Sequence, residues 1–126
     1  MNERAQQGAE VRREVLGDAH VDRAEAGTTD FTRPFQDYIT ESVWGSVWTR
    51  PGLDRRTRSC VTLAVLTALG RHEEIAMHVR AAIGNGVTTA EIAEILLHTG
   101  VYAGVPAANA AFAIGQQVLD DLADPA

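Results

Sequence analysis

The sequence predicts an all-α protein, and three observations carry that prediction. The 126 residues are 45% hydrophobic but only 6% aromatic, which favours an interior of Ala, Val, Leu and Ile, as in packed helices. Apolar residues recur at helical spacing in successive segments that Gly and Pro separate. No segment shows the apolar–polar alternation of a half-buried strand. We therefore expect about six helices in a single domain over residues 1–126.

The first part of the chain is predicted to hold two helices. Residues 2–17 form the first, which ends at a Leu-Gly-Asp sequence. Residues 19–30 are polar and contain a glycine, so we expect a loop there. Asp30 or Thr32 is expected to cap the second helix, over residues 31–48. Its apolar side chains lie near helical spacing: Phe31, Phe35, Tyr38, Ile39, Val43 and Val47.

The next predicted helix begins after Asp54 and ends at Gly70. Its residues 60–69 are apolar on nearly every side. A helix of that kind is buried all round. In a chain of this length, it is expected either at the centre of the fold or at a contact between subunits.

Three further signals divide the rest of the chain into helices. A stripe of Ile, Val and Ala predicts a helix over residues 72–83, and the Gly-Asn-Gly at 84–86 predicts its left-handed C-cap. Thr88 and Glu91 have the spacing of a capping box, which opens the next helix. Pro106 then starts an Ala-rich final helix.

Charge and cysteine content exclude several classes of function. The net charge of −6 and the pI near 5.1 argue against a general nucleic-acid or anionic-membrane surface. A single cysteine, Cys60, excludes an internal disulfide and a Cys-rich zinc site, and we expect it to be a small core residue. No apolar run is long enough for a transmembrane helix, and the first residues lack the apolar segment of a secretory signal, so we expect a cytoplasmic protein.

The predicted helix 72–83 carries the most suggestive polar residues. Glu74 and His78 are four residues apart and share one face, so their side chains are able to pair. A carboxylate next to an imidazole orients it and favours its protonated form, which prepares a histidine for acid–base work. Arg71 lies one turn earlier on the same side. A solvated helix face explains the same pattern, so spacing alone leaves both interpretations open.

Glu94 and His98 form a second pair with this spacing, and Tyr102 follows one turn later. This polar edge is either a wall of a pocket or a polar seam between subunits. We expect no metal site, because His72 and His78 are six residues apart and do not share a helical face. The P-loop, the dinucleotide-binding glycine motif and the serine nucleophile elbow are all missing from the sequence.

Trp44 and Trp48 are also four residues apart, and Arg50 follows them. One interpretation is an aromatic stripe in the core. The other is a flat apolar wall with a cation at its edge, which would suit a small ring that bears carboxylates.

The order of these motifs resembles the carboxymuconolactone decarboxylase family, whose helical fold is shared with AhpD-type alkylhydroperoxidases. The resemblance extends over about residues 8–122 and is carried first by the segment 53–115, from "LDRRTRSC" to "AAFAIG". The more specific stretches are "VLGDAHVDRA" and "WGSVWTRPGL", which are similar to the N-terminal extension of the γ-carboxymuconolactone decarboxylases of protocatechuate breakdown.

This resemblance implies an AhpD-like helical bundle that assembles into trimers or hexamers, with pockets near subunit contacts. Residues 1–50 would be the extension helices and residues 51–122 the core helices. The peroxidase branch requires two cysteines in a CxxCxxxH arrangement that ends at the histidine. Arg71 and Glu74 occupy the cysteine positions before His78, so thiol peroxidase chemistry is excluded.

The resemblance also implies a reaction, the decarboxylation of γ-carboxymuconolactone to β-ketoadipate enol-lactone without a cofactor. In this interpretation His78 donates a proton and Glu74 keeps it oriented and charged. The remaining candidates bind substrate: Arg71 and Arg50 hold carboxylates, Trp44 and Trp48 form an apolar wall, and Glu94 and Tyr102 form a polar rim. Two alternatives stay open, namely another small carboxylated lactone or enolisable acid as substrate, and a non-catalytic, oligomeric binding module.

Overall fold

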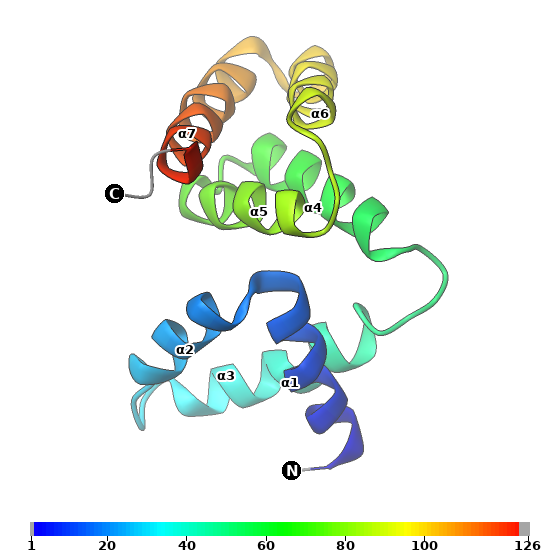
Figure 1. Cartoon of the computed structure of the whole chain (residues 1–126), viewed down its shortest axis with the longest axis vertical. Helices are drawn as coiled ribbons and strands as arrows, with labels where there is room; N and C mark the ends of the chain where they lie inside the picture. Colours follow the sequence, from blue (N-terminus) through cyan, green and yellow to red (C-terminus); the bar gives the residue numbers. More distant parts are fainter. Residues whose placement is uncertain (1, 124–126) are drawn as a thin grey trace. The chain divides into compact units, whose positions relative to one another are not determined.

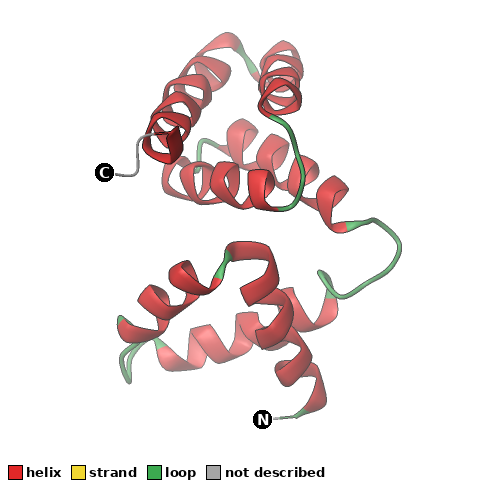
Figure 2. Ribbon diagram, in the orientation of Figure 1, coloured by secondary structure: helices red, strands yellow, loops and turns green. Residues whose placement is uncertain are grey.

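The computed structural model describes residues 2–123, and helices account for all the regular structure in that range (Figures 1 and 2). The all-α prediction is confirmed, with seven α-helices and one π-helical segment in place of about six helices. In chain order they are α1 (Glu3–Leu16), α2 (Asp18–Ala26), α3 (Arg33–Ile39), η1 (Thr40–Trp44), α4 (Arg55–Leu69), α5 (His72–Gly84), α6 (Thr89–Ala103) and α7 (Val105–Ala123).

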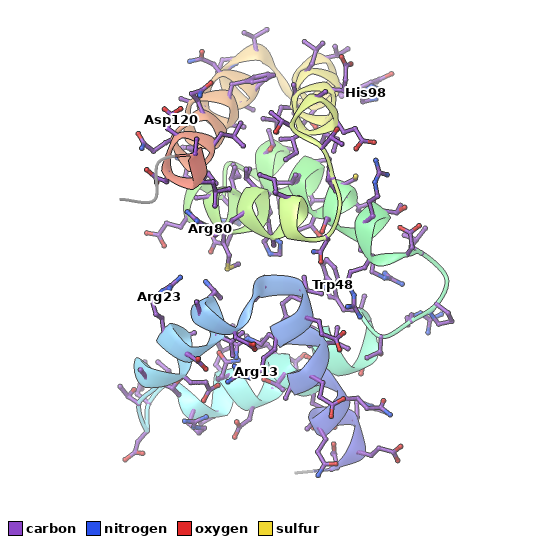
Figure 3. All side chains as sticks on the ribbon, viewed as in Figure 1. Arg13, Arg23, Trp48, Arg80, His98 and Asp120 are labelled. Carbon is purple, nitrogen blue, oxygen red and sulfur yellow. The ribbon has the colours of Figure 1, made fainter. Side chains whose placement is uncertain are left out.

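The additional helix is α2, so the expectation of a loop over residues 19–30 was wrong for most of that stretch. Gly17, with φ of 90°, turns the chain between α1 and α2. Arg13 of α1, labelled in Figure 3, then bonds to two carboxylates of α2, at 3.2 Å from Asp18 and 2.9 Å from Asp22. These tertiary contacts favour a helix where the polar composition alone indicated a loop.

The chain divides into two compact units, one up to Arg55 and the other from Arg56 onward. The assignment of residues 1–126 to a single domain, with an extension over residues 1–50 and a core over residues 51–122, stays a prediction. The first unit contains α1 to α3 and η1, and the second contains α4 to α7.

In the first unit, α1 packs closely against η1 because two glycines meet at the contact. A Cβ atom on Gly8 would run into the carbonyl oxygen of Thr40 and the backbone of Gly45. A Cβ atom on Gly45 would in turn run into the backbone of Arg4. The two backbones therefore approach each other at a distance that only glycine allows.

The aromatic side chains of the first unit divide into a buried and an exposed set. Trp44, at the end of η1, is buried. By contrast, Phe31, Phe35 and Tyr38 are 92%, 65% and 67% exposed. Most of the predicted helix over residues 31–48 is therefore present as α3 and η1. Much of its apolar side, however, does not face the interior of the unit.

The second unit has its own hydrophobic core, to which all four of its helices contribute. Helix α7 packs against both α5 and α6, and Figure 1 draws α6 and α7 above α4 and α5. Cys60 packs against this core and is partly buried. The most deeply buried members are Leu63, Ile75, Val79, Ala82, Leu96 and Ala111.

Helix α4 is not buried all round. Leu63 and Thr67 are buried, but Val61, Val65 and Leu69 are about half exposed on the opposite face. These three residues follow one another at intervals of four, so they form a continuous apolar strip. The other helices of the second unit therefore leave this face of α4 largely uncovered.

The ends of α5 and α6 follow the sequence signals. Gly86 has φ of 93°, so the left-handed residue of the Gly-Asn-Gly turn is the second glycine. The amide of Asn85 donates a hydrogen bond to the hydroxyl of Ser59 at 3.1 Å, which ties this turn to α4. Thr88 and Glu91 form the predicted capping box. Glu91 also pairs with Arg56 of α4.

Candidate functional site

The histidine of main interest, His78, lies in the middle of α5 and is only 8% exposed. Its Nδ1 atom is buried. Next to it along the helix, Val79 and Ala82 belong to the hydrophobic core. The structure therefore places a titratable ring at the edge of the core, where bulk water has little access to it.

Glu74 and Arg71 lie near the start of the same helix, and both are exposed. Arg71 occupies the N-cap position, and Glu74 belongs to the first turn. An acidic residue in a first turn is favoured by the helix dipole, which gives a structural explanation for Glu74 beside the catalytic interpretation. The helix is continuous from His72 to Gly84, so the i,i+4 relation of Glu74 and His78 is confirmed. Their pairing stays a prediction.

The second group of candidates lies on the outer side of α6. Glu94, His98 and Tyr102 are all exposed. His98 projects outward from α6 (Figure 3), and its ring lies 5.3 Å from that of Tyr102, with a 35° angle between the planes. In the single chain this edge of α6 is therefore exposed. Its exposure is compatible with both interpretations from the sequence, a pocket wall and a polar seam between subunits.

The tryptophan pair belongs to the first unit. The rings of Trp44 and Trp48 lie 5.2 Å apart at 35° to each other, which is a favourable geometry for aromatic side chains. Trp48 and the exposed Arg50 line a cavity of about 460 Å³ beside α1. That volume suits a small ligand. Its lining also carries acidic side chains, and one of these, Glu14, bonds to Arg55 at 2.7 Å.

The predicted site residues divide between the two units. Trp44, Trp48 and Arg50 belong to the first unit. The second unit carries the others, on or next to two consecutive helices: Arg71, Glu74 and His78 at α5, and Glu94 and Tyr102 on α6.

A buried arginine in the first unit was not predicted from the sequence. Arg12 is 6% exposed and lies 3.4 Å from Glu25, which in turn lies 3.3 Å from Arg33. Burial lowers the pKa of Arg12 from its usual value, and the neighbouring Glu25 opposes that shift. The signal was present in the sequence, because Arg12 lies on the same helical face as Gly8 and Val15, both of which are buried.

These arginines line a cavity of about 570 Å³ in the first unit, together with residues of α1, α2, α3 and η1. Arg13 contributes to the same wall, and hydrogen bonds to Asp22 and Asp18 raise its pKa. The charges in this cavity are largely compensated. Glu25 lies between Arg12 and Arg33, and Glu41 lies 3.9 Å from Arg4.

An apolar groove lies in the second unit between α6 and α7. Its volume is about 340 Å³, and its lining is almost entirely apolar. The large side chains that line it are Leu97, Val101, Val105 and Phe112. This groove is called the α6–α7 groove below.

Two further findings concern the described residues 2–123. None of their helices is long and apolar enough to cross a bilayer. They also bring no three or more His, Cys, Asp or Glu side chains together as ligands for a metal ion.

Comparison with known proteins identifies the class to which this fold and these residues belong. The model of the Carboxymuconolactone decarboxylase family matches residues 33–117, which is more than half of the chain. The chain belongs to this family, and the resemblance found in the sequence is confirmed.

Two relatives cover nearly the whole chain. A 4-carboxymuconolactone decarboxylase of Acinetobacter baylyi is 52% identical over 120 residues, which are 95% of this chain and 90% of that protein. A nitrosuccinic acid decarboxylase of Metarhizium robertsii is 45% identical over 118 residues, which are 94% of this chain and 82% of that protein. Both relatives are decarboxylases by name.

Proposed function

We propose that this chain is a carboxy-lyase that decarboxylates γ-carboxymuconolactone, also called 4-carboxymuconolactone, to β-ketoadipate enol-lactone in the protocatechuate branch of aromatic catabolism. The observation that carries this proposal is the 52% identity over 95% of the chain to a relative with that name. The 120 matched residues include the family segment 33–117 and most of the residues before it.

The chemistry of such a substrate explains what the protein has to supply. Loss of CO₂ from the quaternary ring carbon sends an electron pair through the ring C=C bond to the lactone carbonyl. The substrate therefore contains its own electron sink. The protein has to hold two carboxylates, stabilise the developing oxyanion and protonate the carbon next to the carbonyl. None of these steps calls for a cofactor.

His78 is the proton donor in this proposal. Its burial supports the role, because a donor sheltered from bulk water transfers its proton to the bound intermediate in preference to solvent. Glu74, one turn earlier on α5, would orient the imidazole and favour its charged form.

The other candidates are proposed to bind substrate. Arg71 and Arg50 are exposed, and a guanidinium is able to hold a carboxylate through two hydrogen bonds. Trp44 and Trp48 would give the departing carboxylate an apolar wall, since their rings form a packed pair. Glu94 and Tyr102 would form the polar rim.

A second substrate class is favoured by a specific observation, the 45% identity to a nitrosuccinic acid decarboxylase. Nitrosuccinic acid is also a dicarboxylic acid, and its nitro group is able to accept the electron pair that decarboxylation releases. The demands on the protein are therefore the same: two anchored carboxylates, a stabilised anion and one proton. A non-catalytic binding module, the third interpretation, predicts that replacing His78 changes stability alone.

We propose further that the chain forms a homo-oligomer, a trimer or a hexamer. Support comes from the exposed strip of Val61, Val65 and Leu69 on α4, since contiguous apolar surface of this kind marks an interaction site on a protein in water. A cytoplasmic location stays a prediction.

A direct comparison of the two substrates tests the proposed function. The purified chain is given γ-carboxymuconolactone or nitrosuccinic acid at equal concentrations, and CO₂ release is followed. We expect kcat/KM for the lactone to exceed that for the nitro acid by at least tenfold. A higher kcat/KM for nitrosuccinic acid would make the nitro acid the preferred substrate. If neither compound released CO₂, both proposed substrates would be wrong.

A further inference from the structure

We propose that the exposed aromatic side chains of the first unit bind the α6–α7 groove of a second copy of this chain. These side chains, Phe31, Phe35 and Tyr38, are called the aromatic stripe. The inference rests on the homo-oligomer proposed above and specifies which two surfaces meet.

Two members of the aromatic stripe, Phe35 and Tyr38, share one side of α3, and the third, Phe31, lies in the turn before that helix. Their exposed fractions of 92%, 65% and 67% leave most of each side chain uncovered. With roughly 150–250 Å² for each fully buried aromatic side chain, the stripe offers about 350–550 Å² of mainly apolar area. That is about half of the 800 Å² or so that each partner buries in a standard interface.

The α6–α7 groove is apolar and large enough to receive part of the aromatic stripe. Its walls are Leu97 and Val101 from α6 and Val105 and Phe112 from α7, and all four side chains are exposed. Its lining also includes Gly100 and Ala108, two small residues at which the helices approach closely, since a Cβ atom on Gly100 would lie 2.7 Å from that of Ala108. A cavity of about 150 Å³ accommodates one benzene molecule, so a groove of about 340 Å³ has room for two aromatic rings.

The two shapes favour a contact between unlike surfaces. Two grooves placed face to face would enclose a void, and the side chains around it would lack contacts. A projecting stripe in a groove fills that space. A contact between different surfaces of identical chains closes into a ring where the rotation from copy to copy allows it, and otherwise continues as an open filament. A ring of this kind is what the proposed trimer or hexamer requires.

Cross-linking between two differently substituted chains tests the proposal. Both chains carry Cys60→Ser; one also carries Phe35→Cys and the other Val101→Cys, and a tag makes one chain heavier. After co-expression and treatment with a short bis-maleimide, we expect a cross-linked product that contains one heavy and one light chain. Ala19→Cys, at an exposed position of α2, replaces Phe35→Cys in the matched control and should give at least tenfold less of that product.

Three results would overturn the proposal. The first is a mixed product no more abundant than with the Ala19→Cys control. The second is a predominant link between two Phe35→Cys chains, which would mean that the stripes face each other. The third comes from one chain that carries both cysteines: a link within the chain and none between chains would mean that the groove is filled without a second copy.

Light scattering on the unsubstituted chain separates this inference from the proposals on which it rests. A mass of 13.6 kDa would show that the chain is a monomer and would contradict the proposed homo-oligomer. An oligomer that fails to give the mixed cross-link would contradict only the choice of surfaces. Catalytic turnover by the same preparation reports on the proposed reaction independently of either result.

Discussion

At the scale of single residues, two buried ionisable side chains distinguish this protein from a plain helical bundle. His78 is buried on α5, and Arg12 is buried on α1. Burial has opposite consequences for the two. For His78 it limits access of bulk water to a proposed proton donor, whereas for Arg12 it destabilises a charge that Glu25 compensates.

Removal of the partner of Arg12 is expected to destabilise the first unit. Glu25→Ala leaves Arg12 and Arg33 without their shared carboxylate. A fully buried pair would cost about 3–5 kcal/mol, and because Glu25 is partly exposed we expect about 1–3 kcal/mol. Arg12→Met removes the buried charge itself, so its cost should be smaller. Urea unfolding near neutral pH compares the two variants, and a larger loss for Arg12→Met would contradict this account.

At the scale of helices, local sequence signals set where most helices begin and end. The contact between α1 and η1 depends instead on two glycines, Gly8 and Gly45, that let the backbones come close. The π-helical segment ends at the buried Trp44, so this contact also fixes one member of the tryptophan pair.

Gly8→Ala is therefore expected to be destabilising. The new methyl group would meet the backbone of Thr40 and Gly45, which cannot move aside as the end of a side chain would. Overpacking of this kind costs about 1–3 kcal/mol. Gly27→Ala is the matched control, because a Cβ atom there would be at an ordinary distance of 3.6 Å from the carbonyl oxygen of Arg23. Equal midpoints of thermal unfolding for the two variants would contradict the close-approach argument.

The capping box that opens α6 gives a second prediction at this scale. The hydroxyl of Thr88 accepts a hydrogen bond from the backbone N–H of Glu91 at 3.1 Å. Thr88→Ala removes that acceptor and should lower the free energy of unfolding by about 1 kcal/mol, whereas Thr88→Ser keeps it. Chemical denaturation of both variants checks this. If serine were as costly as alanine, the methyl group of Thr88 and not its hydroxyl would be what matters.

At the scale of the whole molecule, the main feature is apolar surface that the single chain leaves uncovered. It occurs in both units: the aromatic stripe in the first, and the strip on α4 and the α6–α7 groove in the second. A net charge of −6 is enough to keep copies apart unless specific surfaces bring them together. The proposed homo-oligomer would cover these surfaces.

Val65→Asp tests whether the strip on α4 belongs to a subunit contact. Val65 lies at the middle of this strip and is about half exposed, so the substitution should leave the fold of the single chain intact. An unpaired carboxylate in an apolar contact is strongly unfavourable, so light scattering should report a lower mass at unchanged helix content by circular dichroism. Ala90→Asp, in the first turn of α6, is the control and should keep the mass of the unsubstituted chain. Equal masses for the two variants would exclude this face from the assembly.

Much of this fold could be predicted from the sequence, because its signals are local. The capping box at Thr88, the turn after α5 and the limits of α4 all depend on residues within one or two helical turns. Two features escaped prediction because they depend on contacts distant in sequence. Helix α2 is held by Arg13 of α1, and the exposure of Val65 on α4 was not deducible from a sequence that allowed either a central position or a subunit contact. Periodicity shows that a face is apolar but does not show what covers it.

The candidate site could be predicted as a set of residues but not as a geometry. The spacing of Glu74 and His78 on one helix was deducible, and so was the four-residue spacing of Trp44 and Trp48, but not the contact between the two tryptophan rings. The burial of His78 depends on how α5 packs in the second unit, which the sequence of α5 alone does not specify. Arg12 was missed because charged residues on a helix are usually exposed.

The central claim is that His78 delivers the proton that completes decarboxylation. Its most direct test is turnover of γ-carboxymuconolactone in D₂O by the unsubstituted chain and by His78→Gln, with CO₂ release and deuterium at the carbon next to the lactone carbonyl as readouts. We predict that the folded variant loses at least 100-fold in kcat, which matches the ~10²–10⁴ that a positioned acid or base contributes. Undiminished turnover and deuterium incorporation by a folded His78→Gln chain would show that His78 is a packed core residue and that another group donates the proton.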